Sequence, residues 1–245
     1  MRALFNGCSF VWGDELIDPM STRFSRLVCN QTGMEEYNIS LRGASNSRIY
    51  RTTLDWIQLN GNPDVLIVVW SGQDRIEYID LNEKDRHDTY YLQCSPSRLH
   101  AKEFQRKKRH LSAYMSEILN DYKCSIDIIN YMCSIQHICE ISNIKLLQFQ
   151  FTSGHRKMKT AISNTEPRSG REAAFLDYYK SKLNYLKEYS TYGLNDDHDL
   201  LTMSKNISDV MFGENFYGHP LEDSQVLFKD MMIKELEEHY DIRFQ

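Results

Sequence analysis

No hydrophobic run in this chain of 245 residues approaches the roughly 18 apolar residues that a membrane span requires. Glycine and proline are also scarce, with 11 and 5 residues, which excludes a fibrous or low-complexity protein. The first ten residues, MRALFNGCSF, lack a basic flank followed by an apolar stretch. We therefore expect no secretory signal and a cytoplasmic location.

The chain also has no excess of basic residues. The 29 Lys and Arg residues face 34 Asp and Glu residues, and the formal net charge of −5 argues against a general binder of nucleic acid or anionic membranes. Six scattered cysteines form no CxxC pair, so we expect reduced thiols. Cys133 and His137 share a helical face, but Cys139 would point elsewhere, so we favour core cysteines over a metal site.

Apolar segments alternate between strand-like and helix-like patterns. Residues 64–70, DVLIVVW, are apolar on both faces, as a central parallel strand is. The expected strands are 2–7, 36–40, 64–70 and 144–151, and the expected helices are about 20–33, 44–59, 111–141 and the segment after Pro220. The alternation predicts an α/β fold, a flavodoxin-like three-layer α/β/α arrangement with a mostly parallel sheet of about five strands. Two polar, irregular stretches near 80–110 and 152–206 are predicted to be lid-like insertions in a single domain spanning 1–245.

The site of a parallel sheet lies at the carboxyl ends of its strands. Ser9, Gly43 and Gln73 follow the first three expected strands, and His219 opens the last expected helix. A serine hydroxyl needs an adjacent base, and histidine serves near neutral pH. The oxyanion of acyl transfer needs fixed donors, which the N–H groups of Ser9 and Gly43 and the Gln73 amide would supply. These residues predict acyl-transfer chemistry without the GxSxG turn of the α/β-hydrolases.

The same segments resemble the sequence blocks of the SGNH (GDSL-type) hydrolases. GCSFVWG resembles the GDS block, with Cys8 in place of the Asp, and NISLRGASN matches the second block through Gly43. SGQD stands where the GxND block is expected. GHP, followed by a helix, matches the histidine block. The order agrees from residue 7 to the final helix, and the overall look is closest to compact intracellular versions from phage genomes. If the protein is viral, its location would be the host cytoplasm.

The resemblance implies a serine esterase. Ser9 would be the nucleophile, His219 the base, and Gly43 and Gln73 oxyanion donors, with no metal or organic cofactor. The substrate would be a small acyl ester, such as an O-acetyl group on a carbohydrate.

Two departures from the family leave alternatives open. Gln73 replaces the family Asn, and Phe216 stands where the family has the Asp that orients the histidine. Glu214, a residue of the 196–199 cluster or a backbone carbonyl could replace that Asp. Otherwise the chain is a binding module that keeps the fold without catalysis. A third hypothesis is a nucleic-acid- or partner-binding protein that acts through the basic cluster at 106–110.

Several other residues have both a structural and a functional interpretation. Ser9 could instead cap the helix that follows it. Arg75 and Glu77 could form a local ion pair or contact substrate. The Asp and His run at 196–199 could be a solvated turn or a metal site. A set of tyrosines could pack a helical lid or stack on a sugar: Tyr178, Tyr179, Tyr185, Tyr189 and Tyr192.

Overall fold

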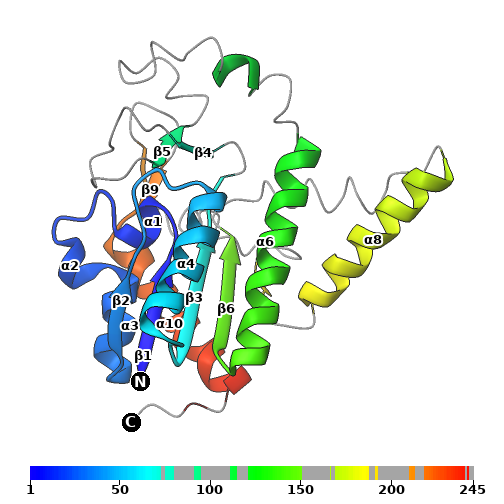
Figure 1. The fold of residues 1–245 in the computed structure, drawn as a ribbon. Coiled ribbons are helices and arrows are strands. Elements are labelled where there is room, and N and C mark those ends of the chain that lie inside the picture. Colours follow the sequence, from blue (N-terminus) through cyan, green and yellow to red (C-terminus); the bar gives the residue numbers. More distant parts are fainter. Residues whose placement is uncertain are drawn as a thin grey trace.

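The computed structural model describes residues 1–72, 75–79, 91–94, 111–114, 121–150, 166, 169–187, 191–192, 210–212, 218–240 and 242. Its centre is a five-stranded parallel sheet in the order β2-β1-β3-β6-β7 (Figure 1). The strands are β1 (Arg2–Asn6), β2 (Glu35–Asn38), β3 (Val65–Trp70), β6 (Lys145–Gln150) and β7 (Thr191–Tyr192). The expected parallel sheet is confirmed.

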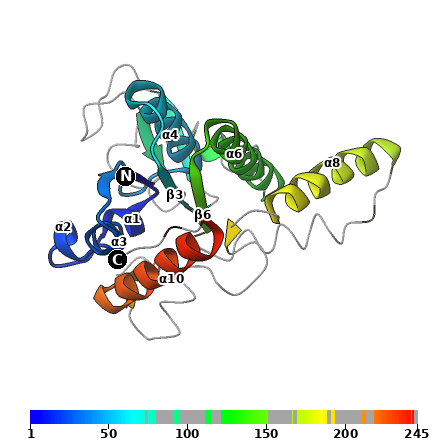
Figure 2. The ribbon, with the colours of Figure 1, turned by 90° about the horizontal axis from the view of Figure 1, so that it is seen from below.

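Helices cover both faces of this sheet. Figure 2 shows α3 (Phe24–Thr32) and α10 (Glu222–Tyr240) on one side of the strands and α4 (Asn46–Asn60) and α6 (Asp121–Ser142) on the other. On the first face, the rings of Phe5, Phe24 and Phe228 meet edge to face with 6.1 Å between successive centroids. On the second face, Trp70 of β3 stacks on Tyr131 of α6. The predicted α/β/α layering is therefore confirmed.

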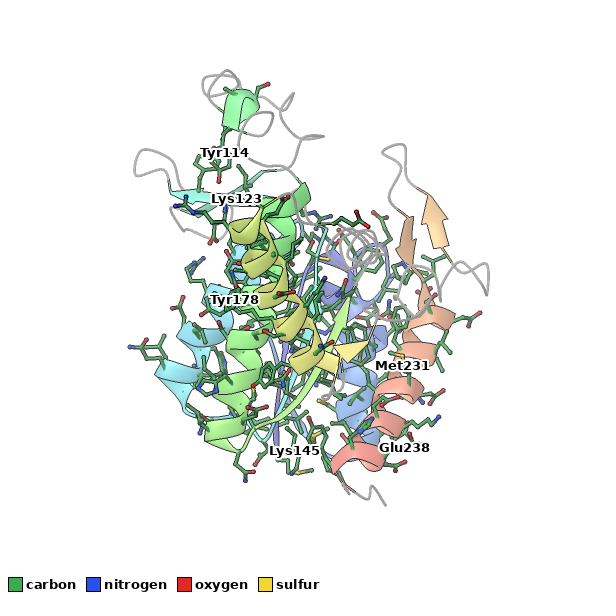
Figure 3. The ribbon with its side chains drawn as sticks, turned by 90° about the vertical axis from the view of Figure 1, so that its right-hand side faces the viewer. Tyr114, Lys123, Lys145, Tyr178, Met231 and Glu238 are labelled. Atoms are coloured by element: carbon green, nitrogen blue, oxygen red, sulfur yellow. The ribbon has the colours of Figure 1, made fainter. Side chains whose placement is uncertain are left out.

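The middle strand, β3, is fully buried along its length because it has a strand on each side and a helix layer on each face. The one polar group among its side chains is satisfied: the Trp70 indole N–H donates to Gln148 Oε1 at 2.9 Å. Gln148 in turn donates to the Met132 carbonyl of α6. Figure 3 places Lys145 at one end of the sheet and Lys123 of α6 at the other, so α6 runs antiparallel to β6.

The helix expected at 20–33 is wrong in one respect, because it is interrupted. α2 (Pro19–Thr22) ends where Arg23 adopts an extended backbone, and α3 begins at Phe24. The Phe24 N–H donates to Gln225 Oε1 of α10 at 3.0 Å, so a tertiary contact takes the place of a bond to a preceding helical carbonyl.

The two insertions contain more regular structure than the sequence pattern indicates. The first includes the antiparallel pair β4 (Ile76–Ile79) and β5 (Tyr91–Cys94). In the second, the expectation of an irregular stretch at 152–206 is wrong in part, because α8 (Gly170–Lys187) packs on α6 and extends away from the sheet (Figure 1). Residues 111–114 and α6 confirm parts of the helix expected at 111–141, whereas 115–120 lie outside the described residues. Among the described helices, none combines the length and the hydropathy that a membrane span requires.

A buried ion cluster fastens α3 to the edge strand β2. Glu36 accepts from Arg23 Nε at 3.0 Å and from Ser25 Oγ at 2.6 Å, and Arg26 lies 2.7 Å from its other oxygen. The side chains of Glu36 and Arg23 are only 1% and 6% exposed. Removing one partner of such a pair leaves a buried charge without compensation.

We predict that Glu36→Gln lowers the free energy of unfolding by about 3–5 kcal/mol, because Arg23 loses its counter-charge. The adjacent Glu35 is exposed, and Glu35→Gln is the matched control with little expected change. Urea denaturation of both variants measures the difference. Equal midpoints for the two variants would show that the cluster contributes no stability.

Candidate active site

Ser9 lies where the first strand turns into a helix. β1 ends at Asn6, and α1 (Ser9–Trp12) begins two residues after Gly7, with Cys8 at the N-cap. The interpretation of Ser9 as the helix cap is therefore wrong. As the first helical residue, Ser9 has a backbone N–H that the helix itself cannot bond. The residue is buried, with 3% of its surface exposed.

Hydrogen bonds of Asn6 and close packing at Gly7 fix the turn before Ser9. Asn6 donates from Nδ2 to the Ile49 carbonyl and to Thr53 Oγ1 of α4, both at 2.9 Å, and its Oδ1 accepts from the Gly7 N–H. A Cβ at Gly7 would overlap Val11 Cγ2 and lie 3.0 Å from the Val69 carbonyl oxygen. Only glycine therefore lets α1 approach the sheet this closely.

Gly43 lies in the tight turn that follows β2. The Ala44 N–H donates to the Leu41 carbonyl at 3.0 Å and closes the turn. Gly43 is its third residue and has a φ of 74°, as a type II turn requires. A side chain would be strained here. The closing bond does not use the Gly43 N–H, which suits the predicted oxyanion role.

Three contacts hold the Ser9 turn beside the Gly43 turn. The Leu41 N–H donates to the Gly7 carbonyl at 3.2 Å. Asn38 Nδ2 donates to the Val11 carbonyl of α1 at 2.9 Å. Arg42, next to Gly43, pairs with Asp14 at 2.7 Å, and the Asp14 N–H donates to the Ser9 carbonyl. The structure thus brings two of the predicted donors together.

The third loop is attached to the second by Asn46. Its Nδ2 donates to the carbonyls of Ser71 and Gly72, and its Oδ1 accepts from the Ser71 N–H at 2.7 Å. Gln73 comes next in the chain and lies outside the described residues, so its role remains a prediction.

The expected ion pair between Arg75 and Glu77 is wrong. Glu77 is bound by Arg51 of α4 through two contacts, at 2.7 and 3.1 Å. The strand β4 carries Glu77 against α4, which brings its carboxylate to Arg51.

The segment that contains His219 lies near the C-terminal end of the sequence, yet it reaches the same edge of the sheet as α1. It lies in β9 (Gly218–Pro220), which pairs antiparallel with β8 (Val210–Phe212). The prediction that His219 opens the last helix is wrong by a few residues, because α10 begins at Glu222. β9 contacts both α1 and α10 (Figure 1). The backbone segments of Ser9 and His219 are therefore neighbours, and the position of the imidazole is outside the described part of the chain.

The remaining candidates divide into those the structure describes and those it does not. Tyr179 is buried, and Tyr185 donates to Glu140 at 2.7 Å, so both stabilise the packing of α8 on α6. Tyr178 is 53% exposed on α8 (Figure 3). The following lie outside the described residues or have undescribed side chains: Tyr189, Tyr192, Glu214, Phe216, and residues 106–110 and 196–199.

Cys133, His137 and Cys139 all lie on α6, where the sequence favours core cysteines over a metal site. Burial raises the pKa of Cys133 to about 11 and that of Cys139 to about 12, so both thiols are protonated at neutral pH. Within the ranges that the structure describes, no three His, Cys, Asp or Glu residues come close enough to hold a metal.

The positioning residues Asp14, Asn38 and Asn46 were not singled out from the sequence. Asn38 and Asn46 do fall inside the NISLRGASN block, so their proximity to Gly43 was a usable signal. Asp14 gave no such signal, since its partner Arg42 comes only after α2, α3 and β2 in the chain.

Comparison with known proteins supports the architecture. No protein-family model matches the chain, and no curated protein sequence matches it significantly. Among solved structures, the psychrotrophic esterase EstA from Pseudoalteromonas sp. aligns over 98% of both chains with a TM-score of 0.51 and 10% identity. A G-D-S-L family lipolytic protein from Veillonella parvula aligns over 98% of both chains with a TM-score of 0.48 and 10% identity. The chain has the fold of EstA, as the resemblance to the SGNH hydrolases implies.

We predict that Gly7→Ala destabilises the protein and displaces Ser9, because the added methyl group must push α1 away from β3. Overpacking of this kind costs about 1–3 kcal/mol. Gly170→Ala at the start of α8 meets nothing within 4 Å and is the control. Thermal unfolding measures both variants. An unchanged melting temperature for Gly7→Ala would show that the turn has room that we do not expect.

Proposed function

We propose that the protein is a serine esterase that hydrolyses a small acyl ester, with an O-acetyl group on a carbohydrate as the substrate class that the family resemblance implies. The observation that supports this most strongly is the contact of α1, which begins with Ser9, with β9, which contains His219. These two segments come from opposite ends of the chain, and both lie at the carboxyl edge of the sheet, where sites of such folds are found.

In the proposed mechanism, Ser9 Oγ attacks the ester carbonyl carbon while His219 removes the hydroxyl proton. The carbonyl oxygen becomes an oxyanion. When the tetrahedral intermediate collapses, the bond to the alcohol breaks and His219 returns the proton to the leaving oxygen. A water then attacks the acyl-enzyme with His219 again as base, which releases the carboxylic acid and restores Ser9.

The oxyanion would be held by the N–H groups of Ser9 and Gly43 and by the Gln73 amide. Donors stabilise a transition state best when they are fixed before the reaction, and one such donor contributes about 2.7–4 kcal/mol. The contacts of Asp14, Asn38 and Asn46 support this proposal, because they fix the separation of the three loops.

The acid that usually orients the histidine is replaced by Phe216 in the sequence. We propose that Glu214, a residue of 196–199 or a backbone carbonyl holds the second ring nitrogen. An imidazole without this partner has a less favourable tautomer, so the reaction is slower than with a full triad.

The structural comparison also supports ester hydrolysis. EstA is named an esterase, and its structure is described as inhibited by monoethylphosphonate. A tetrahedral phosphorus centre resembles the tetrahedral intermediate of ester hydrolysis. Because one fold hosts many activities, this likeness supports the chemistry only together with the contact between α1 and β9.

We predict that Ser9→Ala and His219→Ala each lower kcat/KM for p-nitrophenyl acetate by about a thousandfold or more, as loss of a nucleophile or its base does in serine hydrolases. Ser181→Ala on α8 and His137→Ala on α6 are the matched controls and should keep the rate of the unmodified protein. Initial rates with each purified variant provide the measurement.

Equal rates for Ser9→Ala and the unmodified protein would remove the nucleophile from the proposal. A protein that folds but hydrolyses no ester, with or without Ser9, would favour the binding module that keeps the fold without catalysis.

A further inference from the structure

Arg75 lies between the second and third loops of the proposed site. Its Nη1 donates to Ser71 Oγ at 2.9 Å, and the same nitrogen lies 3.5 Å from the Ala44 carbonyl oxygen. Ala44 directly follows Gly43, and Ser71 begins the loop that leads to Gln73. The guanidinium is therefore held beside the loops that would bind the oxyanion.

Among the residues that the structure describes, no acidic side chain pairs with Arg75. Two other arginines near these loops have carboxylate partners: Arg42 pairs with Asp14, and Arg51 pairs with Glu77 and Asp55. Arg75 is half-buried, yet within the described residues no carboxylate contacts it. Its described partners are the Ser71 hydroxyl and the Ala44 carbonyl, which are neutral groups and leave the guanidinium charge in place.

We propose that Arg75 binds a carboxylate group of the substrate, so that the enzyme prefers esters with an acid group a few bonds from the reacting carbonyl. This inference rests on the proposed esterase function. A net charge of −5 disfavours anionic ligands in general, so a local cation is needed to bind one.

The geometry suits an arginine in this role. A guanidinium has five N–H donors in a rigid plane and can bind a carboxylate through two parallel hydrogen bonds. Nη1 is occupied by the loop contacts, which fix the plane, and Nε and Nη2 make no hydrogen bond to the described residues.

Two matched pairs of esters test the proposal. Monomethyl and dimethyl succinate differ by an acid group on the acyl side, and 4-acetoxybenzoate and its methyl ester differ by one on the alcohol side. The measured quantity is the ratio of kcat/KM for the acidic ester to that for the neutral one. We expect a ratio above one in at least one pair, falling about tenfold or more in Arg75→Met, with an intermediate ratio in Arg75→Lys.

Arg171→Met on α8 is the control. It changes the net charge by the same amount, is exposed, and lies on the helix that extends away from the sheet (Figure 1). Its ratio should equal that of the unmodified protein. If Arg75→Met does not fold, the unmodified protein still tests the proposal, because raising the salt concentration should lower the ratio toward one.

A binding measurement separates this inference from the proposed function. Calorimetric titration of 4-acetoxybenzoate and of monomethyl succinate into Ser9→Ala should show binding that Ser9→Ala/Arg75→Met lacks. If both pairs are hydrolysed with Arg75-independent ratios, Arg75 does not bind the acid group and the inference fails. If no ester is hydrolysed but binding depends on Arg75, the carboxylate site stands and the esterase function fails. Absence of both overturns the two proposals together.

Discussion

The close approach of α1 to the sheet at Gly7 is the constraint on which the site depends. It requires a residue without a side chain between Val11 and the Val69 carbonyl, and Asn6 fixes the same turn by bonding to α4. This packing sets the position of the first helical residue, Ser9. The other loops are then attached to it through backbone and side-chain contacts, so the geometry of the site follows from how the first strand ends.

The attachment of the loops also explains how an edge made of separate turns can be rigid. Asn38 and the Arg42–Asp14 pair connect the first and second loops, and Asn46 connects the second and third. Most of these bonds are made to backbone N–H and C=O groups, and such groups are costly to bury without a partner. The same contacts therefore stabilise the fold and preorganise the donors, which is what stabilisation of a transition state requires.

The sequence was informative where a local pattern determines the structure. The apolar run at 64–70 identified the central strand, and the strand ends located Ser9 and Gly43 at one edge of the sheet. The sequence-based predictions were wrong where a contact between distant residues determines the structure. The helix break at Arg23 is accompanied by the bond from Phe24 to Gln225, and the partner of Glu77 is Arg51 rather than Arg75. The helix α8 was indicated only by the spacing of its tyrosines; its buried residues Leu176, Tyr179, Leu183 and Leu186 recur at helical spacing within a stretch that is otherwise polar. The roles of Gln73 and His219 stay predictions, since their side chains are not described.

The most direct test of the proposed chemistry is reaction with a fluorophosphonate, which modifies serines that an adjacent base activates. We predict one covalent adduct, mapped by peptide mass spectrometry to Ser9, absent in Ser9→Ala and formed far more slowly in His219→Ala. No adduct on the folded protein, or an adduct that Ser9→Ala leaves unchanged, would contradict the assignment of Ser9 as an activated nucleophile.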